Sequence, residues 1–165
     1  MQLDVVKDWA RAKAYLEKAM DKAFYVSFAT VGADGVPTVT PIGSLVLNDD
    51  QTGFYMERFP RSIPANAAHN PNFCLLAENM KLRSAIKEFR NGGWGGLRLF
   101  GTLGEKREAS AAEIGRIRDR LPFGHFKRGG GLLLANTVYV RDLSFRRAEA
   151  LVAHFDRSSQ TFTIL

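Results

Sequence analysis

The chain has 165 residues, of which 45% are hydrophobic, so it can bury one sizeable core but not two, and we expect residues 1–165 to form a single domain. Its formal net charge of +6 favours anionic partners, but the basic residues lack the clustered stripe of a nucleic-acid-binding surface. A single cysteine, Cys74, excludes a disulfide framework, and without a signal-peptide pattern or a run of about 18 apolar residues we expect a cytoplasmic protein.

The N-terminal third predicts a helix followed by a β-hairpin. Apolar residues recur at helical spacing over residues 5–22, with Asp4 as the capping residue. Residues 24–31 and 36–47 are rich in β-branched and aromatic side chains, and the glycines of "GADG" between them are typical of a hairpin turn. Because the second strand contains Pro37, Pro41 and Gly43, it is expected at a sheet edge or at a bulge.

The middle of the chain alternates short strands and helices. A turn at "NDDQTG" leads into a strand over residues 54–58, and a short helix over 63–69 stops before Pro71. Strands are expected over 72–79 and 92–105, separated by a helix through residues 82–89.

The C-terminal third predicts a capped helix and closing strands. Ser110 and Glu113 fit a capping box, and the helix that they begin runs to Pro122. A loop at "KRGGG" precedes up to three strands, over residues 136–149, 150–155 and 161–165. Strands joined by short turns, with helices inserted at intervals, indicate an α+β protein whose antiparallel sheet curls into a barrel with peripheral helices.

The stretch "MERFPRSIPANAAHNP" is the strongest candidate for a binding site. Arg58, Arg61 and Ser62 precede a helix whose first amide groups have no partner within the helix. Guanidinium, hydroxyl and amide donors together suit a phosphate, and Thr38 and Thr40 on the interrupted strand add hydroxyls. The alternative is a solvent-facing turn in which the arginines bind nothing and Ser62 only caps the helix.

The order of "FATVGADGVPTVTPI", "GFYMERFPRSIPANAAHNPNFCLL" and "GLRLFGTL" resembles the pyridoxamine 5′-phosphate oxidase-like, FMN-binding split-barrel family, over roughly residues 20–105. The resemblance implies a split β-barrel of six or more antiparallel strands and a homodimer with FMN between its subunits. It also implies contacts with the flavin ring and with the ribityl phosphate. The residues for the ring are Thr40, Pro41, Ile42 and Gly43, and those for the phosphate are Tyr55, Met56, Arg61 and Ser62.

The chain departs from the family oxidases at two positions. Ser62 stands where they have a second basic residue, whose charge Arg58 would have to supply, and Leu45 stands where they have a lysine on the ring strand. Since that lysine belongs to the substrate apparatus of the oxidases, we expect a related flavoprotein with another substrate.

Two further residues are candidates for the cofactor site. Trp94 lies among glycines that would let its indole approach a flavin ring, and Arg98 could reach a flavin carbonyl or phosphate. The alternatives are a turn with one semi-exposed aromatic residue and an ordinary outward-facing strand residue. The three histidines lack the spacing of a zinc site, so no metal is expected.

Three functions compete on this sequence. The first is an FMN-dependent oxidoreductase that transfers a hydride to or from a small-molecule substrate, with no catalytic side chain assigned. The second is a non-catalytic flavin, deazaflavin or haem binding protein on the same barrel. A nucleic-acid binder depends on net charge alone and ranks last; no membrane partner is expected either.

Overall fold

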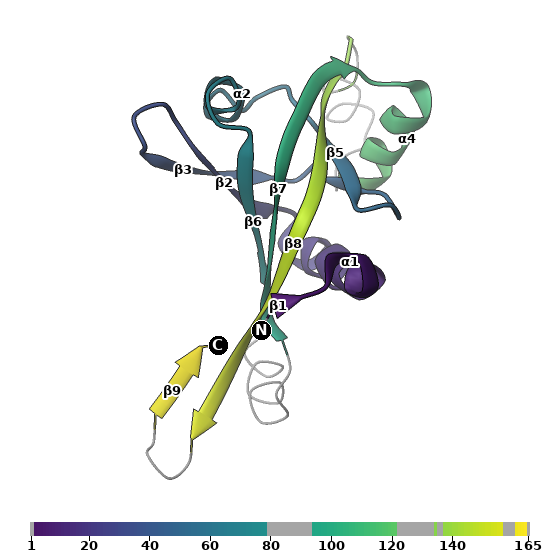
Figure 1. Cartoon of the computed structure of the whole chain (residues 1–165). Helices are drawn as coiled ribbons and strands as arrows, with labels where there is room; N and C mark the ends of the chain where they lie inside the picture. The colour runs from purple at the N-terminus through teal and green to yellow at the C-terminus, as the bar shows by residue number, and fades with distance from the viewer. Residues whose placement is uncertain (1, 79–93, 122–133, 135–136, 157–160, 165) are drawn as a thin grey trace.

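The computed structural model describes residues 2–78, 94–121, 134, 137–156 and 161–164 (Figure 1). The strands of this part are β1 (Gln2–Leu3), β2 (Val26–Val31), β3 (Pro37–Ile42), β4 (Val46–Leu47), β5 (Thr52–Met56), β6 (Asn72–Glu78), β7 (Trp94–Glu108), β8 (Tyr139–Asp156) and β9 (Thr161–Ile164). Its helices are α1 (Val5–Ala23), α2 (Ser62–Ala67) and α4 (Ala111–Arg120).

The strands form one antiparallel sheet that curls as a split barrel. The main path runs in the order β3-β2-β6-β7-β8-β5-β4, and β1 and β9 both pair with β8. Helix α1 contacts β2, β6, β7 and β8, whereas α2 lies on the β2–β3 hairpin and α4 lies on β4 (Figure 1). The α+β class, the antiparallel barrel and the peripheral helices are therefore confirmed.

The predicted N-terminal helix is confirmed together with its cap. The side chain of Asp4 accepts hydrogen bonds from the backbone amides of Val6 and Lys7, at 3.0 and 3.2 Å. The apolar stripe of α1 faces the inside of the barrel, where Leu16 is fully buried. Burial of one such leucine stabilises the fold by about 1.5–3 kcal/mol.

The hairpin and its edge strand are also confirmed, but the second strand is shorter than predicted. Strand β3 lies at one end of the sheet path, where the prolines remove no central hydrogen bonds. It stops at Ile42, and the chain resumes an extended path only at Val46. A side chain on Gly43 would lie 2.7 Å from the carbonyl oxygen of Phe24. A close backbone contact therefore requires glycine where the strand ends.

The capping box is confirmed, because the Ser110 hydroxyl accepts from the amide of Glu113 while the Glu113 carboxylate accepts from the amide of Ser110. The predicted strand break after Glu149 is wrong. Glu149 and Ala150 both continue the pairing of β8 with β7, so β8 and β9 take the place of three closing strands. The helix expected through residues 82–89 and the loop at 127–131 lie outside the described residues.

The core divides into a larger and a smaller cluster. The larger cluster joins the stripe of α1 to the inner side chains of the sheet, where the Phe28 ring stacks on Phe73 with centroids 4.7 Å apart. The smaller cluster lies between β4, β5, β8 and α4, around Phe54 and Ile117. Strand β5 contributes to both clusters, and the segment that follows it leads to α2.

Candidate functional site

The strand predicted to hold the flavin ring meets the turn predicted to hold its phosphate. Thr40 Oγ1 on β3 lies 3.2 Å from Ser62 Oγ at the start of α2, although 22 positions separate them in the chain. Thr38 and Thr40 are half-buried, whereas Pro37, Val39 and Pro41 between and beside them are exposed. The alternation of the strand thus directs the two hydroxyl groups toward α2.

A buried asparagine fixes α2 on the hairpin. Asn66 Nδ2 donates to Thr30 Oγ1 at 2.9 Å and to Thr38 Oγ1 at 3.0 Å, and only 8% of Asn66 is exposed. The Thr38 hydroxyl therefore already belongs to the network that holds α2 on the hairpin. We call residues 58–62 the basic turn. The hydroxyl groups that remain for a ligand at this turn are those of Thr40 and Ser62.

The basic turn differs from the predicted helix start. Ser62 is the first residue of α2 and does not cap it; the capping position is Arg61, whose side chain makes no capping hydrogen bond. Both Arg58 and Arg61 are exposed. Because α2 has six residues, its dipole is small, and an anion here would depend on guanidinium and hydroxyl donors.

Several predicted contact residues point their side chains into the core. Ile42 and Met56 are buried, and Tyr55 is fully so. The amide of Met56 already donates to Ser44 Oγ at 3.1 Å. The side chains of these three residues are therefore not presented to a ligand at the surface, while Pro41 presents its ring to solvent.

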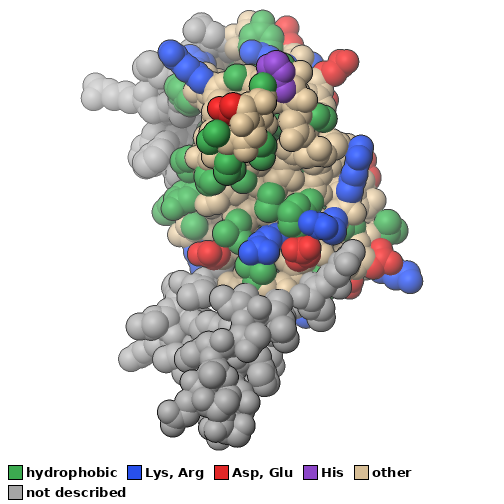
Figure 2. Space-filling model, turned by 60° about the vertical axis from the view of Figure 1, so that its left-hand side comes forward, with side chains coloured by type: hydrophobic (Ala, Val, Ile, Leu, Met, Phe, Trp, Pro, Cys, Tyr) green, Lys and Arg blue, Asp and Glu red, His purple; other side chains and the backbone are tan. Residues whose placement is uncertain are grey.

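The outer face of the sheet carries an apolar row, which Figure 2 views from the β3 side. In register across four strands lie Val39, Ala29, Cys74 and Phe100. Val39 is 66% exposed, and the guanidinium of Arg147 lies 3.9 Å from the centre of the Phe100 ring. This outer row is apolar along its length, and at one end it is bordered by the ion pair of Arg147 with Glu149, whose Nε and Oε1 lie 3.5 Å apart.

Arg98 occupies the same outer face. Its Nη1 lies 3.8 Å from Glu149 Oε2, and its side chain is 45% exposed. The structure therefore places Arg98 on the accessible face. It does not bring Arg98 to the strand that carries Thr40, because β6 and β2 lie between β7 and β3. Trp94 begins β7 opposite Val152, and its indole lies outside the described side chains.

A buried ion pair lies where β5 ends, and the sequence reading missed it. Arg141 on β8 forms a two-pronged hydrogen bond with the Glu57 carboxylate: its Nε bonds Oε2 and its Nη2 donates to Oε1 at 3.0 Å. Tyr55 also donates to Oε2, at 2.9 Å, and the Glu57 side chain is only 3% exposed. Burial, aided by the Glu57 charge, raises the pKa of Tyr55 far above its ordinary value. In the sequence, Glu57 beside Arg58 looks like an ordinary surface charge, so no local signal marked it.

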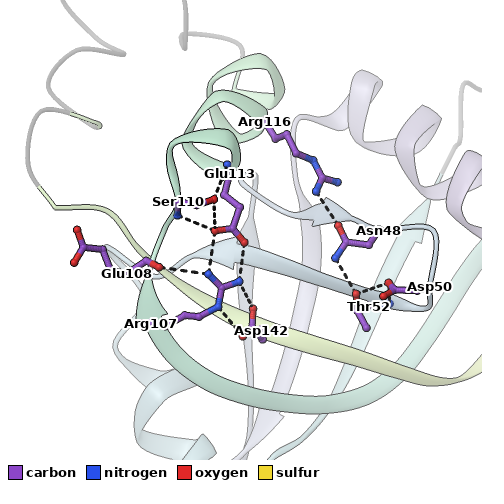
Figure 3. A network of polar contacts seen from close by, with 9 residues as sticks. All are labelled: Asn48, Asp50, Thr52, Arg107, Glu108, Ser110, Glu113, Arg116 and Asp142. Carbon is purple, nitrogen blue, oxygen red and sulfur yellow. Dashed lines mark hydrogen bonds and ion pairs between the residues drawn. The ribbon is translucent and has the colours of Figure 1, made fainter.

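A second arginine network, centred on Arg107, holds α4 to β8 (Figure 3), and it adjoins the buried pair because its Asp142 follows Arg141 on β8. Arg107 donates to both oxygens of Asp142, at 2.9 and 2.8 Å, and to both oxygens of Glu113, at 3.0 and 2.7 Å. The hydrogen bonds from Arg107 lower the pKa of Glu113 to about 2. Because the donors of Arg107 are hydrogen-bonded to these two carboxylates, the network joins α4 to β8 and offers no donors to a ligand.

The described residues contain no group of three His, Cys, Asp or Glu side chains arranged to hold a metal ion. None of the described helices combines the length and the apolar character that crossing a bilayer requires.

Comparison with known proteins identifies the fold. No protein-family model matches the sequence, and no curated protein matches it. Among solved structures, an FMN-binding protein from Syntrophomonas wolfei is 17% identical, with a TM-score of 0.55, over 88% of this chain and 92% of that one. A protein related to general stress protein 26, of the pyridoxinephosphate oxidase family, from Clostridium acetobutylicum is 12% identical, with a TM-score of 0.55, over 97% and 94%. HutZ, the haem storage protein from Vibrio cholerae, is 12% identical, with a TM-score of 0.53, over 84% and 94%. At these identities the similarity shows a shared fold.

Proposed function

The chain has the split-barrel fold of the pyridoxamine 5′-phosphate oxidase-like proteins, and from this premise we propose that it binds FMN and acts as an FMN-dependent oxidoreductase. The observation that carries the proposal is the meeting of Thr40 and Ser62, whose hydroxyl oxygens are 3.2 Å apart beside the basic turn. Two structures with the same fold are described as an FMN-binding protein and as a member of the pyridoxinephosphate oxidase family.

The donor set of this corner fits a phosphate dianion. When their mutual hydrogen bond is exchanged for bonds to the ligand, Thr40 and Ser62 would each donate a hydroxyl hydrogen, and the exposed guanidinium of Arg61 would donate a charge-assisted bond. Arg58, three positions before Arg61, adds a second positive charge. The nearest buried carboxylate, Glu57, is already neutralised by Arg141, so it does not repel an anion.

The outer row suits a contact with a second copy of the chain. Val39 and Pro41 expose apolar surface on the face of β3 opposite to Thr40, and Phe24 and Tyr25 are 58% and 51% exposed. Because β3 is an edge strand, a cofactor with its phosphate beside Thr40 would lie close to such a contact. Exposed apolar surface of this kind is typical of a contact that association buries. We therefore propose a homodimer with the cofactor between its subunits. We also propose that the protein is located in the cytoplasm.

The bound flavin would supply the chemistry, by accepting and returning a hydride. The residues of the chain would hold the phosphate with Arg61 and Ser62, position the ring against β3, and exclude water with apolar side chains. Leu45, where the family oxidases have a lysine, is 1% exposed and presents no charge to a substrate. A small molecule other than pyridoxamine phosphate is therefore the proposed substrate.

A second candidate function is non-catalytic binding of a flavin, deazaflavin or haem, which the similarity to HutZ favours. An absorbance spectrum of the purified protein, followed by mass identification of the molecule released on denaturation, distinguishes the two cofactor classes. The proposal predicts a yellow protein that releases FMN. A Soret band with released haem would replace the proposal with the second candidate, and a colourless protein that fails to bind added FMN would contradict both.

A further inference from the structure

We propose that the buried pair of Glu57 and Arg141 is a positioning device for the basic turn, and that it sets the preference of the protein for a phosphorylated flavin. The inference rests on the proposed function, since it assumes that the turn receives the phosphate of FMN. Neither residue would touch the ligand. Their effect would be to hold the arginines of the turn, Arg58 and Arg61, at a fixed place relative to Thr40 and Ser62.

The pair lies at the point where the chain leaves the sheet. Met56 is the last residue of β5 and pairs with Val140, and the amide of Glu57 donates to the carbonyl of Tyr139 at 2.9 Å. The basic turn begins with the next residue. A rotation of the chain about Glu57 would therefore move Arg58 and Arg61 relative to β3.

Several groups hold the Glu57 carboxylate at once. It receives hydrogen bonds from Arg141 and Tyr55, and Lys106 Nζ lies 3.8 Å from Oε1. Arg141 is fixed in turn, because its Nη1 donates to the carbonyl of Gly104 at 3.0 Å. Apolar residues of similar volume often stabilise a core as well as a buried ion pair does. What the planar, two-pronged bond adds is a defined position and orientation.

The other end of the segment is fixed independently. Asn66 ties α2 to Thr30 and Thr38, nine positions after Glu57. The segment from Glu57 to Asn66 is thus fixed at both ends, and Glu57 is the end that precedes Arg58 and Arg61. Loss of the contacts of Glu57 should leave α2 on the hairpin while the two arginines move.

The test compares the dissociation constants of FMN and riboflavin, which differ only by the phosphate. The test variant is Glu57→Leu/Arg141→Met, which keeps the net charge and fills the same space with apolar groups. Its matched control is Arg107→Met/Glu113→Gln, which also keeps the net charge and removes the arginine pair that holds α4. Flavin fluorescence quenching gives both constants, and thermal unfolding shows that each variant is folded.

The wild type should bind FMN at least about tenfold more tightly than riboflavin. In the Glu57/Arg141 variant this ratio should fall to about threefold or less, with riboflavin binding nearly unchanged, while the control keeps the wild-type ratio. A milder variant, Glu57→Gln, retains the shape of the side chain and should lower the ratio by about twofold; it carries the test if the double variant does not fold.

A folded double variant that keeps the full FMN preference would overturn the positioning role and leave the proposed function intact. A wild type that binds neither flavin would overturn the proposed function and the positioning role together. An equal fall of the ratio in the control would also overturn the positioning role, because the effect would then follow from general destabilisation.

Discussion

The two arginine networks use the same chemistry in different surroundings. Arg141 and Glu57 have side chains that are 13% and 3% exposed, whereas the side chains of Arg107 and Asp142 are both 41% exposed. The buried network lies beside the basic turn, and the exposed one joins α4 to β8. Solvent screens the exposed charges, so that network contributes little to stability, while a buried charge that loses its partner is costly. This difference predicts that replacing Arg141 lowers the free energy of unfolding more than replacing Arg107 does.

The largest effect is expected from Arg141→Met, which leaves the Glu57 carboxylate buried without its main partner. We expect the free energy of unfolding to fall by about 3 kcal/mol, at the low end for a broken buried pair because Lys106 lies near. Urea denaturation measures it. The double variant with Glu57→Leu should regain most of the loss, and a single variant as stable as the wild type would remove the contrast between the networks.

The next effect concerns the ligand. Arg61→Ala should weaken FMN binding by about 1.5–3 kcal/mol, the value of a charge-assisted hydrogen bond to phosphate. Arg118→Ala removes an exposed arginine from α4, lowers the net charge equally, and should leave the affinity within twofold. Equal losses in the two variants would show that only net charge attracts the cofactor.

A smaller effect is expected from Arg107→Ala in the exposed network. Screening limits the loss in the free energy of unfolding to about 1 kcal/mol, and high salt should reduce it further. A urea titration at low and at high ionic strength checks both points. A loss as large as that of Arg141→Met would contradict the assigned difference between the surroundings.

The smallest expected effect is a decrease in the free energy of unfolding at acidic pH. Since the folded state lowers the pKa of Glu113 to about 2, its bond with Arg107 contributes stability that is present above the ordinary pKa near 4.5 and is lost as the pH falls toward 2. Carbon-13 NMR titration of the Glu113 carboxyl measures the shift directly. In Arg107→Ala the carboxyl should titrate closer to 4.5.

The elements of the fold could be predicted where local rules decide them. The cap at Asp4, the hairpin glycines, the edge prolines and the Ser110 capping box each act within a few residues, and all are confirmed. The break expected after Glu149 was wrong because the pairing partner β7 extends farther along β8 than the local pattern reveals.

The candidate site could be predicted only in outline. The sequence marked Thr40 and Ser62 separately, and the sheet brings them together. It misplaced the helix cap, because Ser62 bonds across to β3. The partners of Glu57 and Asn66 lie 84 and 36 positions away, so no local pattern could reveal them. Contacts of that separation follow from the strand order of the whole sheet.

The proposed function requires that the basic turn and the Thr40 hydroxyl together receive the phosphate of a flavin. A crystal structure of the protein grown with FMN tests it most directly. We expect phosphate oxygens within about 3 Å of Ser62 Oγ and Thr40 Oγ1, with the Arg61 guanidinium on the same group. A flavin bound elsewhere on the barrel, with its phosphate away from this corner, would contradict it.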